Sequence, residues 1–520
     1  MLRRQTSPAF PCPPVSTEVG NLRREKFLPV VLLVCGVFLY LQVFILPDTP
    51  RAPIGDQSIY LQHGTRMLAG ERIYRDYDHF TLPGTDVLYW GLFRLFGVRA
   101  WIPQAMLVLV GLTLSWSIVY ISGWLAVGSN IFLPSLLFIT LAFSSYLDAT
   151  HHWYSAVFTT ASLAVLMEQR TTKRIAIAGG CWGIATCFTQ SAALGILGLA
   201  YFLFWENGRE QQVRSRLLKN EASLIGGFLA VVLGFNFSFV RLVGLKRFLW
   251  YTVVFLVKYY PADSFNTWRI YLHDWPSRRE WANLPDLAGI AFIHVLIPLV
   301  YVLVFLRYRF EGRVRSTEQW HRLMLVNVIG VTLFLTIASS PAYNRMCTIT
   351  IPGFIVLGWL AGFPGKLDRL LSRSLMVVAL LMLVLKPTIT QTRWEESLTL
   401  PAGRVAFFSL AEFQKLSWLS KRTQPSDYFF GDELAGFLLH LRNPARVPFL
   451  RPTDYTRPEE VEDLIQALQA HQVRFVSWYP GLDISRRGNH LAPVELYLRD
   501  HYHVATAFSN GDKIWERNQL

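Results

Sequence analysis

Asp56 is the first residue of this chain whose type and position could do chemistry. It follows an apolar stretch, 27–46, and Tyr60, His63 and Met67 come after it at helical spacing, so the four side chains would share one face. A carboxylate held at a membrane surface could act as a general base toward a lipid-linked substrate. An isolated acid in this position is also a common helix N-cap, so residue type alone leaves both roles open.

A second polar cluster lies farther along the chain. Asp148, His151 and His152 fall within five residues at the end of another apolar stretch. Together with Asp56 they could hold a divalent metal ion, because carboxylate and imidazole groups are common metal ligands. Adjacent polar residues of this kind also occur at the solvated end of a helix, and Asp148 could instead contact a substrate.

Three basic residues could bind an anion. Arg345 stands at the edge of an apolar segment, where a charge without a partner is costly. Its alternative role is that of an arginine that reaches from a membrane helix to the water. Lys258 and Arg269 lie in a long segment, 242–285, that is rich in aromatic residues, a pattern that also anchors proteins at membrane surfaces.

The elements that must position these residues are predicted to be transmembrane helices. The chain of 520 residues is 52% hydrophobic and 17% charged, and its mean hydropathy is positive, which a soluble protein could not accommodate. Eleven apolar segments are predicted to span the membrane. They are 27–46, 101–125, 131–147, 153–168, 222–241, 286–306, 323–338, 346–362 and 374–387, with two more in 175–205 that turn near Thr189 and Gln190.

The basic loops indicate the orientation of these helices. If the short amphipathic segment 85–96 lies in the membrane interface, the strongly basic loops all fall on one side, which is then the cytoplasm. The net charge of +14 is therefore explained without a nucleic-acid partner. This topology predicts a disordered cytoplasmic tail at 1–26, a transmembrane domain at 27–390 with an outer juxtamembrane loop at 48–97, and an extracytoplasmic domain at 400–520.

The C-terminal part has the composition of a soluble domain. Short predicted strands alternate with predicted helices, which is typical of a small α/β domain. The strands are 427–431 and 473–478, and the helices are 432–441 with Asp432 as N-cap, 458–471 and 494–500. The expected fold is thus a polytopic α-helical membrane protein, with about eleven spans and a small C-terminal α/β domain.

The membrane part resembles the polytopic C-type glycosyltransferases, which include the protein O-mannosyltransferases and the aminoarabinose transferases of lipid A. The first landmark is an acid that begins a juxtamembrane helix, followed by a Pro-Gly tract and an aromatic run. The second is an acid after the third span, and the third is a Thr-centred turn. The matching positions are Asp56, 79–84, 88–90, 96–97, Asp148 and 188–191.

The resemblance implies an enzyme that takes a sugar from a polyprenyl phosphate and passes it to a lipid, glycan or protein acceptor outside the cell membrane. Asp56 would be the catalytic base, and direct displacement would invert the anomeric carbon. The substrate contacts would be Asp148, His79, Tyr60, His63, Gln190, Arg345, Lys258 and Arg269. The resemblance favours a substrate contact for Asp148 over a metal site formed by Asp56, Asp148, His151 and His152, although it leaves a divalent metal open.

Two family lysines that would neutralise the donor phosphate have no counterpart here. Thr81 or Leu82 stands in one place and Gln190 in the other, so Arg345 is the first substitute, and a distinct subfamily is indicated. The expected location is the bacterial inner membrane. Two other classes remain as alternatives: a transporter or flippase of a lipid-linked envelope precursor, and a non-catalytic scaffold for envelope assembly. The sequence shows no paired halves of the kind that many transporters have.

Overall fold

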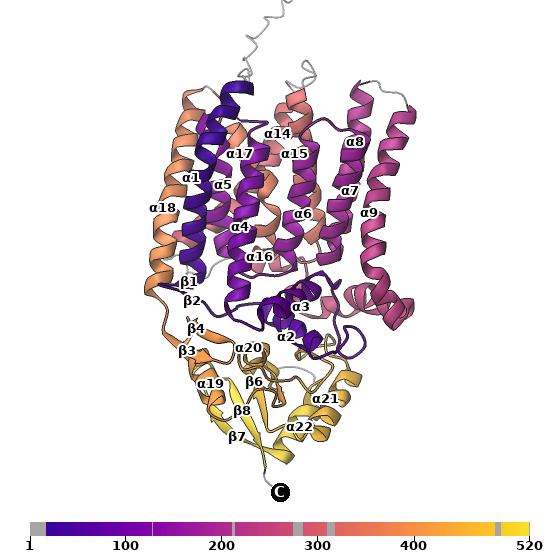
Figure 1. The fold of residues 1–520 in the computed structure, drawn as a ribbon, viewed down its shortest axis with the longest axis vertical. Coiled ribbons are helices and arrows are strands. Elements are labelled where there is room, and N and C mark those ends of the chain that lie inside the picture. Colours follow the sequence, from indigo (N-terminus) through magenta and orange to yellow (C-terminus); the bar gives the residue numbers. More distant parts are fainter. Residues whose placement is uncertain are drawn as a thin grey trace, which may run out of the picture.

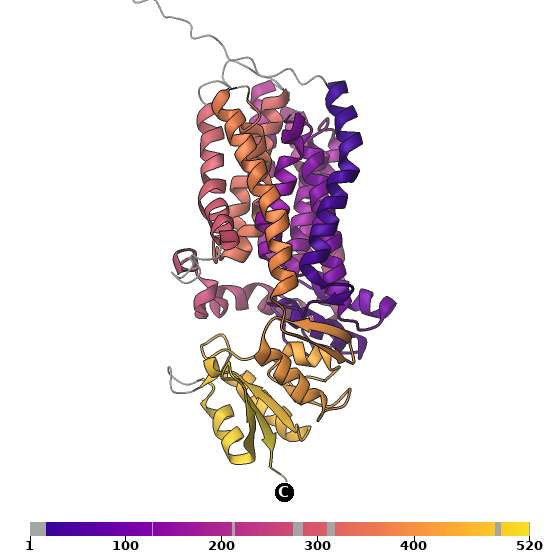
Figure 2. The same cartoon turned by 90° about the vertical axis from the view of Figure 1, so that its left-hand side faces the viewer.

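The computed structural model describes residues 17–126, 128–210, 214–273, 284–308, 318–363, 365–483 and 490–518. It consists of a bundle of long helices and, at one end of that bundle, short helices and a mixed sheet (Figures 1 and 2). Positions 1–16 of the predicted tail lie outside the described residues. The rest of that tail differs from the prediction, because the first helix, α1, already begins at Thr17 and runs to Val43.

Each of the eleven predicted apolar segments is helical. The predicted break in 175–205 is confirmed, because α7 ends at Phe188 and a short 3-10 helix begins at Gln190. The helices of the bundle are α1 (Thr17–Val43), α4 (Trp101–Ser122), α5 (Leu133–Leu137), α6 (His151–Leu166), α7 (Thr172–Phe188), α8 (Ile196–Glu210), α9 (Arg214–Val243), α13 (Leu284–Ile290), α14 (Ile297–Arg307), α15 (Glu318–Ile337), α16 (Tyr343–Ile349), α17 (Ile351–Leu360) and α18 (Lys366–Thr392).

The outer faces of the bundle are apolar. Leu233 of α9 is 64% exposed and Val384 of α18 is 67% exposed, which water would not favour but lipid would. Within the described ranges, six helices are both long and apolar enough to cross a membrane. The chain is therefore an integral membrane protein, while eleven spans remain the prediction from the sequence.

Two short helices lie across one end of the bundle and form the core of the outer juxtamembrane loop. They are α2 (Gln57–Leu68) and α3 (Gly84–Phe96). The 13 residues of α3 span about 20 Å, which is less than the ~30 Å of a bilayer core, so the interfacial helix predicted at 85–96 is confirmed as a short helix. Gly64 allows α2 and α3 to pack closely, because a Cβ atom there would lie 3.0 Å from both Tyr89 and Phe93.

The aromatic segment that follows α9 also lies at this end of the bundle (Figure 1). It contains the short helices α10 (Leu245–Leu249), α11 (Phe255–Lys258) and α12 (Ile270–His273). Tyr251 and Phe248 pack against Tyr74 and Tyr77 of the outer loop in one apolar cluster. The two polar segments 48–97 and 242–285, far apart in sequence, therefore meet in one layer.

The C-terminal part contains a hairpin and a mixed four-stranded sheet. The hairpin pairs β3 (Glu396–Leu400) with β4 (Gly403–Phe407). The sheet has the order β5-β6-β8-β7, in which β5 and β6 are parallel and the other neighbours antiparallel. Its strands are β5 (Phe429–Phe430), β6 (Phe475–Trp478), β7 (Tyr502–Ala507) and β8 (Lys513–Arg517), and the helices beside it are α19 (Leu410–Ser420), α20 (Glu433–Leu438), α21 (Pro458–Ala470) and α22 (Ala492–His501).

Most of the elements predicted for this part are confirmed. Strands occur within 427–431 and 473–478, and helices within 432–441, 458–471 and 494–500. Asp432 is the predicted N-cap, since its carboxylate accepts a hydrogen bond from the backbone N–H of Ala435 at 2.9 Å. The apolar faces of α21 and α22 form a separate core with one face of β6, as expected where strands and helices alternate, whereas α20 belongs to the main core.

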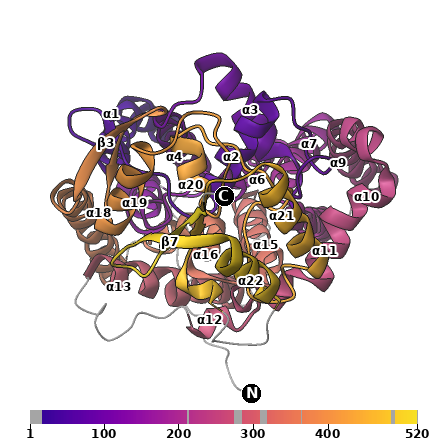
Figure 3. The same ribbon diagram turned by 90° about the horizontal axis from the view of Figure 1, so that it is seen from below.

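The C-terminal part is fixed to the outer loop by backbone contacts. The guanidinium of Arg66 in α2 donates to the backbone carbonyl oxygen of Ala445 at 2.9 Å. The backbone N–H of Asp78 donates to the backbone carbonyl oxygen of Arg446 at 3.0 Å. Helix α20 packs against α2, and Figure 3 shows both from below, with the sheet nearer the viewer. Any site between the two parts is therefore built on paired main chain and not on loose surface loops.

Candidate active site

A cavity of about 570 Å³ lies between the end of the bundle and the C-terminal part. Four distant parts of the chain contribute most of its wall. The outer juxtamembrane loop contributes Asp56 and His79, the aromatic segment contributes Tyr260, α16 contributes Arg345, and the C-terminal part contributes Arg451. The cavity gathers these two arginines among aromatic side chains and four acids, which are Asp56, Asp78, Asp263 and Glu460.

Asp56 occupies the N-cap position of α2, but its side chain does not cap the helix. The cap comes from Asp148, whose carboxylate accepts hydrogen bonds from the backbone N–H groups of Asp56 at 3.1 Å and Gln57 at 3.0 Å. Gly55 permits this approach: its φ is +67°, and a Cβ atom there would come within 2.6 Å of Asp148 Oδ2. Asp148 is thus the residue that caps α2, which is the alternative role predicted for Asp56.

The carboxylate of Asp56 is exposed to the cavity. None of the described residues donates a hydrogen bond to it. The surrounding protein raises the pKa of Asp56 by desolvation, and the charges of Arg345 and Arg451 oppose this rise. A carboxylate with open lone pairs and a raised pKa is suited to accept a proton.

Asp148 is buried, which makes its hydrogen bonds important. Burial raises the pKa of Asp148, the charge of Asp56 raises it further, and the hydrogen bonds that it accepts lower it. We expect Asp148→Ala to lower the stability of the protein by about 1–3 kcal/mol, because two backbone N–H groups would lose their acceptor. Asp148→Asn, which keeps an acceptor oxygen, should cost less. Thermal unfolding in detergent measures both, and equal midpoints for the two variants would contradict this role.

A chain of polar contacts runs along the cavity wall beside Asp56. The hydroxyl of Tyr60 lies 2.8 Å from His151 Nδ1 and 3.3 Å from Thr81 Oγ1. Thr81 in turn contacts His79 Nε2. Tyr60, His79 and His151 all line the cavity. The structure therefore brings together predicted contacts from the outer loop and from the start of α6.

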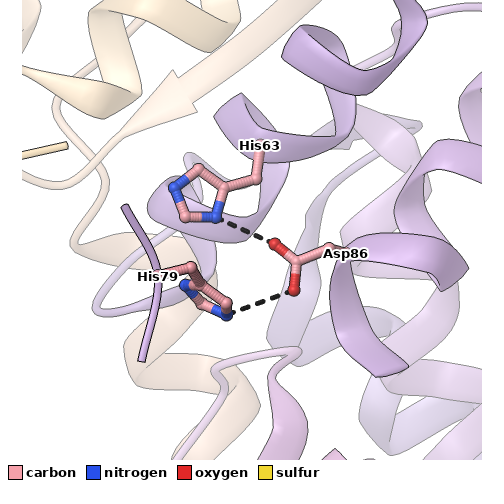
Figure 4. A group of neighbouring side chains, drawn as sticks. All are labelled: His63, His79 and Asp86. Carbon is pink, nitrogen blue, oxygen red and sulfur yellow. Dashed lines mark hydrogen bonds and ion pairs between the residues drawn. The ribbon is translucent and has the colours of Figure 1, made fainter. Parts of the chain in front are cut away.

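His63, in contrast, does not reach the cavity. It is fully buried, and its Nδ1 lies 2.8 Å from Oδ1 of Asp86. Oδ2 of the same carboxylate lies 3.2 Å from His79 Nε2, so Asp86 stands between the two rings (Figure 4). Burial lowers the pKa of His63 to about 4, although the hydrogen bond to Asp86 opposes this. The predicted substrate contact at His63 is thus corrected: its side chain is enclosed where α2 meets α3.

Arg345 lines the cavity as predicted. Its guanidinium donates to the hydroxyl of Tyr260 at 2.7 Å and to the side-chain oxygen of Asn266 at 3.2 Å. These neutral partners leave its charge uncompensated by an ion pair among the described residues. Arg451 is a second cation that the sequence did not indicate, and its Nε lies 3.3 Å from Asp263. Both face the same space as Asp56.

Four other predicted contacts do not lie in the cavity wall, and Asp148, which caps α2, is one of them. Lys258 and Arg269 are exposed, and the Lys258 ammonium lies over the ring of Tyr259. Gln190 is turned toward backbone: its amide nitrogen donates to the carbonyl oxygen of Phe80 at 2.8 Å, and its oxygen faces the N–H of Leu82 at 3.4 Å. A side-chain amide can both donate to a backbone carbonyl and accept from a backbone N–H. Gln190 therefore fixes the outer loop through Phe80 and Leu82.

The four residues considered as metal ligands do not converge. Asp148 uses both carboxylate oxygens on backbone N–H groups, and His152 faces a separate small cavity. Across the described ranges, one group of three histidine, cysteine or acidic residues has ligand atoms close enough for one ion, and it is His63, His79 and Asp86. A metal held by Asp56, Asp148, His151 and His152 does not fit this geometry.

A second cavity of about 320 Å³ lies on the side of Asp56 that faces the C-terminal part. It shares Asp56 and Arg451 with the first cavity and adds Asp432, Glu433 and Tyr479. Burial, followed by the charge of Asp432, raises the pKa of Glu433 to about 7. Asp56 therefore stands where two cavities meet, and Arg345 and most of the aromatic rings line only the larger one.

No protein-family model and no curated protein matches the sequence, but solved structures match the fold. ArnT from Cupriavidus metallidurans in the apo state has a TM-score of 0.56 at 14% identity, over 94% of this chain and 98% of that chain. The oligosaccharyltransferase AglB from Archaeoglobus fulgidus, in complex with an inhibitory peptide and a dolichol-phosphate, has a TM-score of 0.52 at 10% identity, over 95% and 74%. Both are C-type glycosyltransferases, so the predicted resemblance in fold is confirmed.

Proposed function

We propose that this chain, which has the fold of the C-type glycosyltransferases, is a membrane glycosyltransferase that moves a sugar from a polyprenyl-phosphate donor to an acceptor on the extracytoplasmic face. The observation that carries the proposal is the position of Asp56. Its carboxylate has no hydrogen-bond donor within the described residues, and it faces a cavity that also holds Arg345 and Arg451. A base and two phosphate-binding cations around one space are the groups that this reaction needs.

The proposed reaction is a single displacement. Asp56 accepts the proton of an acceptor hydroxyl while that oxygen attacks the anomeric carbon of the donor sugar. The bond between this carbon and the phosphate oxygen breaks, and the bonding pair leaves with the polyprenyl phosphate. Attack from the side opposite the leaving group inverts the anomeric carbon. The proton ends on Asp56, and the negative charge ends on the phosphate.

The charge that develops on the phosphate favours Arg345 and Arg451 as its partners. A guanidinium can donate two parallel hydrogen bonds to phosphate oxygens, and cations in a poorly screened cavity stabilise such a charge strongly. Aromatic rings line the same space: Phe80 stacks with Phe255 at 5.6 Å between centroids and lies 5.2 Å from Tyr260. These rings suit the apolar part of a prenyl chain or the apolar face of a sugar.

The second cavity supports a place for the acceptor. An inverting displacement needs acceptor and leaving group on opposite sides of the sugar, with the base on the acceptor side. Asp56 lines both cavities, whereas Arg345, whose described partners are neutral, lines only the larger one. We therefore assign the donor to the larger cavity and the acceptor, whether lipid, glycan or protein, to the smaller.

The location follows from the same arrangement. The outer loop and the C-terminal part lie together at one end of the bundle (Figure 2), and the positive-inside rule favours a cytoplasmic N-terminus. We propose that 27–390 is the transmembrane domain of a bacterial inner-membrane protein and that 400–520 is its extracytoplasmic domain. Cysteine labelling of an engineered residue at the C-terminus in intact cells tests this orientation.

A transfer assay with labelled donors tests the function. Purified protein in lipid vesicles is incubated with labelled polyprenyl-phosphate sugars and a membrane extract that supplies acceptors. We expect label to leave the prenyl fraction and enter a lipid, glycan or protein product. Label that crosses the vesicle membrane while still attached to the prenyl phosphate would contradict the proposal and indicate a flippase.

The activity should fall on acidification. Asp56 acts as base only when it is deprotonated, and since its pKa is raised, kcat/KM should begin to fall at a higher pH than the ordinary pKa of an aspartate predicts. Burial also raises the pKa of Glu460 in the wall of the larger cavity, and the pKa of Glu433 in the smaller one is about 7. Glu433→Gln should therefore keep the acid limb of the pH profile. If the limb disappears in this variant, Glu433 and not Asp56 is responsible for it.

A further inference from the structure

The carboxylate of Asp86 is held between two imidazole rings in the core of the outer juxtamembrane loop (Figure 4). Asp86 lies in the first turn of α3, His63 in α2, and His79 in the segment that joins them. Asp86 and His63 are fully buried, and His79 is 5% exposed at the cavity wall. Three separate segments of the chain therefore bring two imidazole rings and one carboxylate together in the protein interior.

The charge at this point is not balanced by a basic side chain. Within the part of the chain that the structure describes, Asp86 forms ion pairs with the two histidines and with no lysine or arginine. The guanidinium of Arg66, also in α2, is paired with Glu71 at 2.7 Å. An ionised carboxylate in the protein interior needs a compensating positive charge. A bound cation would supply it.

The hydrogen bonds of the cluster are also incomplete. Nε2 of His63 is buried without a hydrogen-bond partner among the described residues, and Oδ2 of Asp86 has only the ion-pair contact with His79 Nε2 at 3.2 Å. His79 Nε2 faces Asp86 and Thr81 at once, so one ring nitrogen has to serve two oxygen atoms. An ion at this point would replace the proton that now lies between His63 Nδ1 and Asp86 Oδ1, which are 2.8 Å apart.

We propose that His63, His79 and Asp86 form a binding site for a transition-metal ion of the Zn²⁺ type. The ligand atoms would be Nδ1 of His63, Nε2 of His79 and a carboxylate oxygen of Asp86. They all lie within 4.8 Å of one another. Ligands about 2.1 Å from a tetrahedral ion are separated by about 3.4 Å, so small rotations of the three side chains complete the geometry.

The ligand set determines which ions fit. Two imidazole nitrogens and one carboxylate oxygen suit Zn²⁺ and its neighbours, whereas Mg²⁺ and Ca²⁺ prefer oxygen ligands throughout. The ion would fix α2 against α3 and so hold Asp56, at the start of α2, in its place at the cavity.

Metal binding to the full-length protein tests the proposal. The protein, purified in detergent with its affinity tag removed, is treated with a chelator and dialysed, and Zn²⁺ binding is then measured by competition with a chromophoric chelator. We expect about one Zn²⁺ per chain, a raised unfolding temperature on addition of Zn²⁺ and no effect of Mg²⁺. Co²⁺ should give the visible absorption bands of a tetrahedral site.

Variants separate this site from other histidines. Asp86→Asn and His63→Gln should abolish the tight binding of Zn²⁺. His321→Gln is the matched control, because His321 is likewise buried and lies 3.2 Å from an acid, Glu206, in the membrane part. If Asp86→Asn does not fold, His79→Gln is loaded with Co²⁺ instead. The visible bands of a tetrahedral site should then be lost. Failure of the wild-type protein to bind Zn²⁺, or equal binding by the variants and the control, would overturn the proposal, whatever the outcome of the transfer assay.

Discussion

Replacing Asp56 with asparagine is expected to lower kcat for sugar transfer by about 10²–10⁴-fold, the contribution of a general base. The amide is nearly the same size but cannot take the proton of the acceptor hydroxyl. The carboxylate has no hydrogen-bond donor within the described residues, and its helix is capped by Asp148. The unfolding temperature should therefore stay the same or rise, because a charge that is costly to desolvate has been removed.

The matched control is Asp76→Asn in the same loop. Asp76 pairs with Arg75 at 2.7 Å on the surface and lies outside the cavity wall, so its substitution should leave kcat unchanged. A transfer rate that is the same in Asp56→Asn as in the wild type would refute the catalytic assignment. A loss of activity with a much lower unfolding temperature would show that Asp56 acts in the structure and not in the chemistry.

Removing the charge of Arg345 should have the second largest effect. Arg345→Gln is expected to lower kcat by about 10²–10³-fold, as for the loss of one donor to a developing anion. Its present partners, Tyr260 and Asn266, are neutral. The guanidinium can therefore bind a phosphate without breaking an ion pair. Because the charge on the phosphate grows as the bond breaks, kcat should suffer more than KM.

Two further variants give this prediction its contrast. Arg345→Lys keeps the charge but loses the planar fork, so we expect an intermediate loss. Lys258→Gln, in the aromatic segment that carries Tyr260, removes an equal charge at an exposed position outside the cavity and should leave kcat unchanged. Equal losses in Lys258→Gln and Arg345→Gln would indicate a general attraction of the anionic donor to this face of the protein.

Much of the fold could be predicted because the signals are local. Apolar runs of sufficient length mark all eleven helical segments, and the amphipathic pattern of 85–96 identified the short helix α3. The hairpin of β3 and β4 was missed, because β3 follows directly on the last apolar helix and its residues are half-exposed. Strands β7 and β8 were missed since they carry many polar and exposed residues.

The candidate site was predictable only in part. Asp56 stood out because an acid after an apolar stretch is a local pattern. Arg451 did not, since it belongs to a part of the chain that reads as an independent soluble domain, and only long-range packing brings it to Asp56. Asp86 was missed for another reason: an acid in the first turn of a helix is common, and nothing nearby in sequence marks its contacts with His63 and His79.

The cavity is built from residues near both ends of the chain, so it can form only late in the synthesis of the protein. Asp56 leaves the ribosome early, whereas Arg451 is made only after the last apolar helix. At 5–20 residues per second, roughly the rate of translation, tens of seconds separate the two. In the proposed mechanism, every nascent chain in that interval has the base without its second arginine, so the site is complete only after residue 451 has been made.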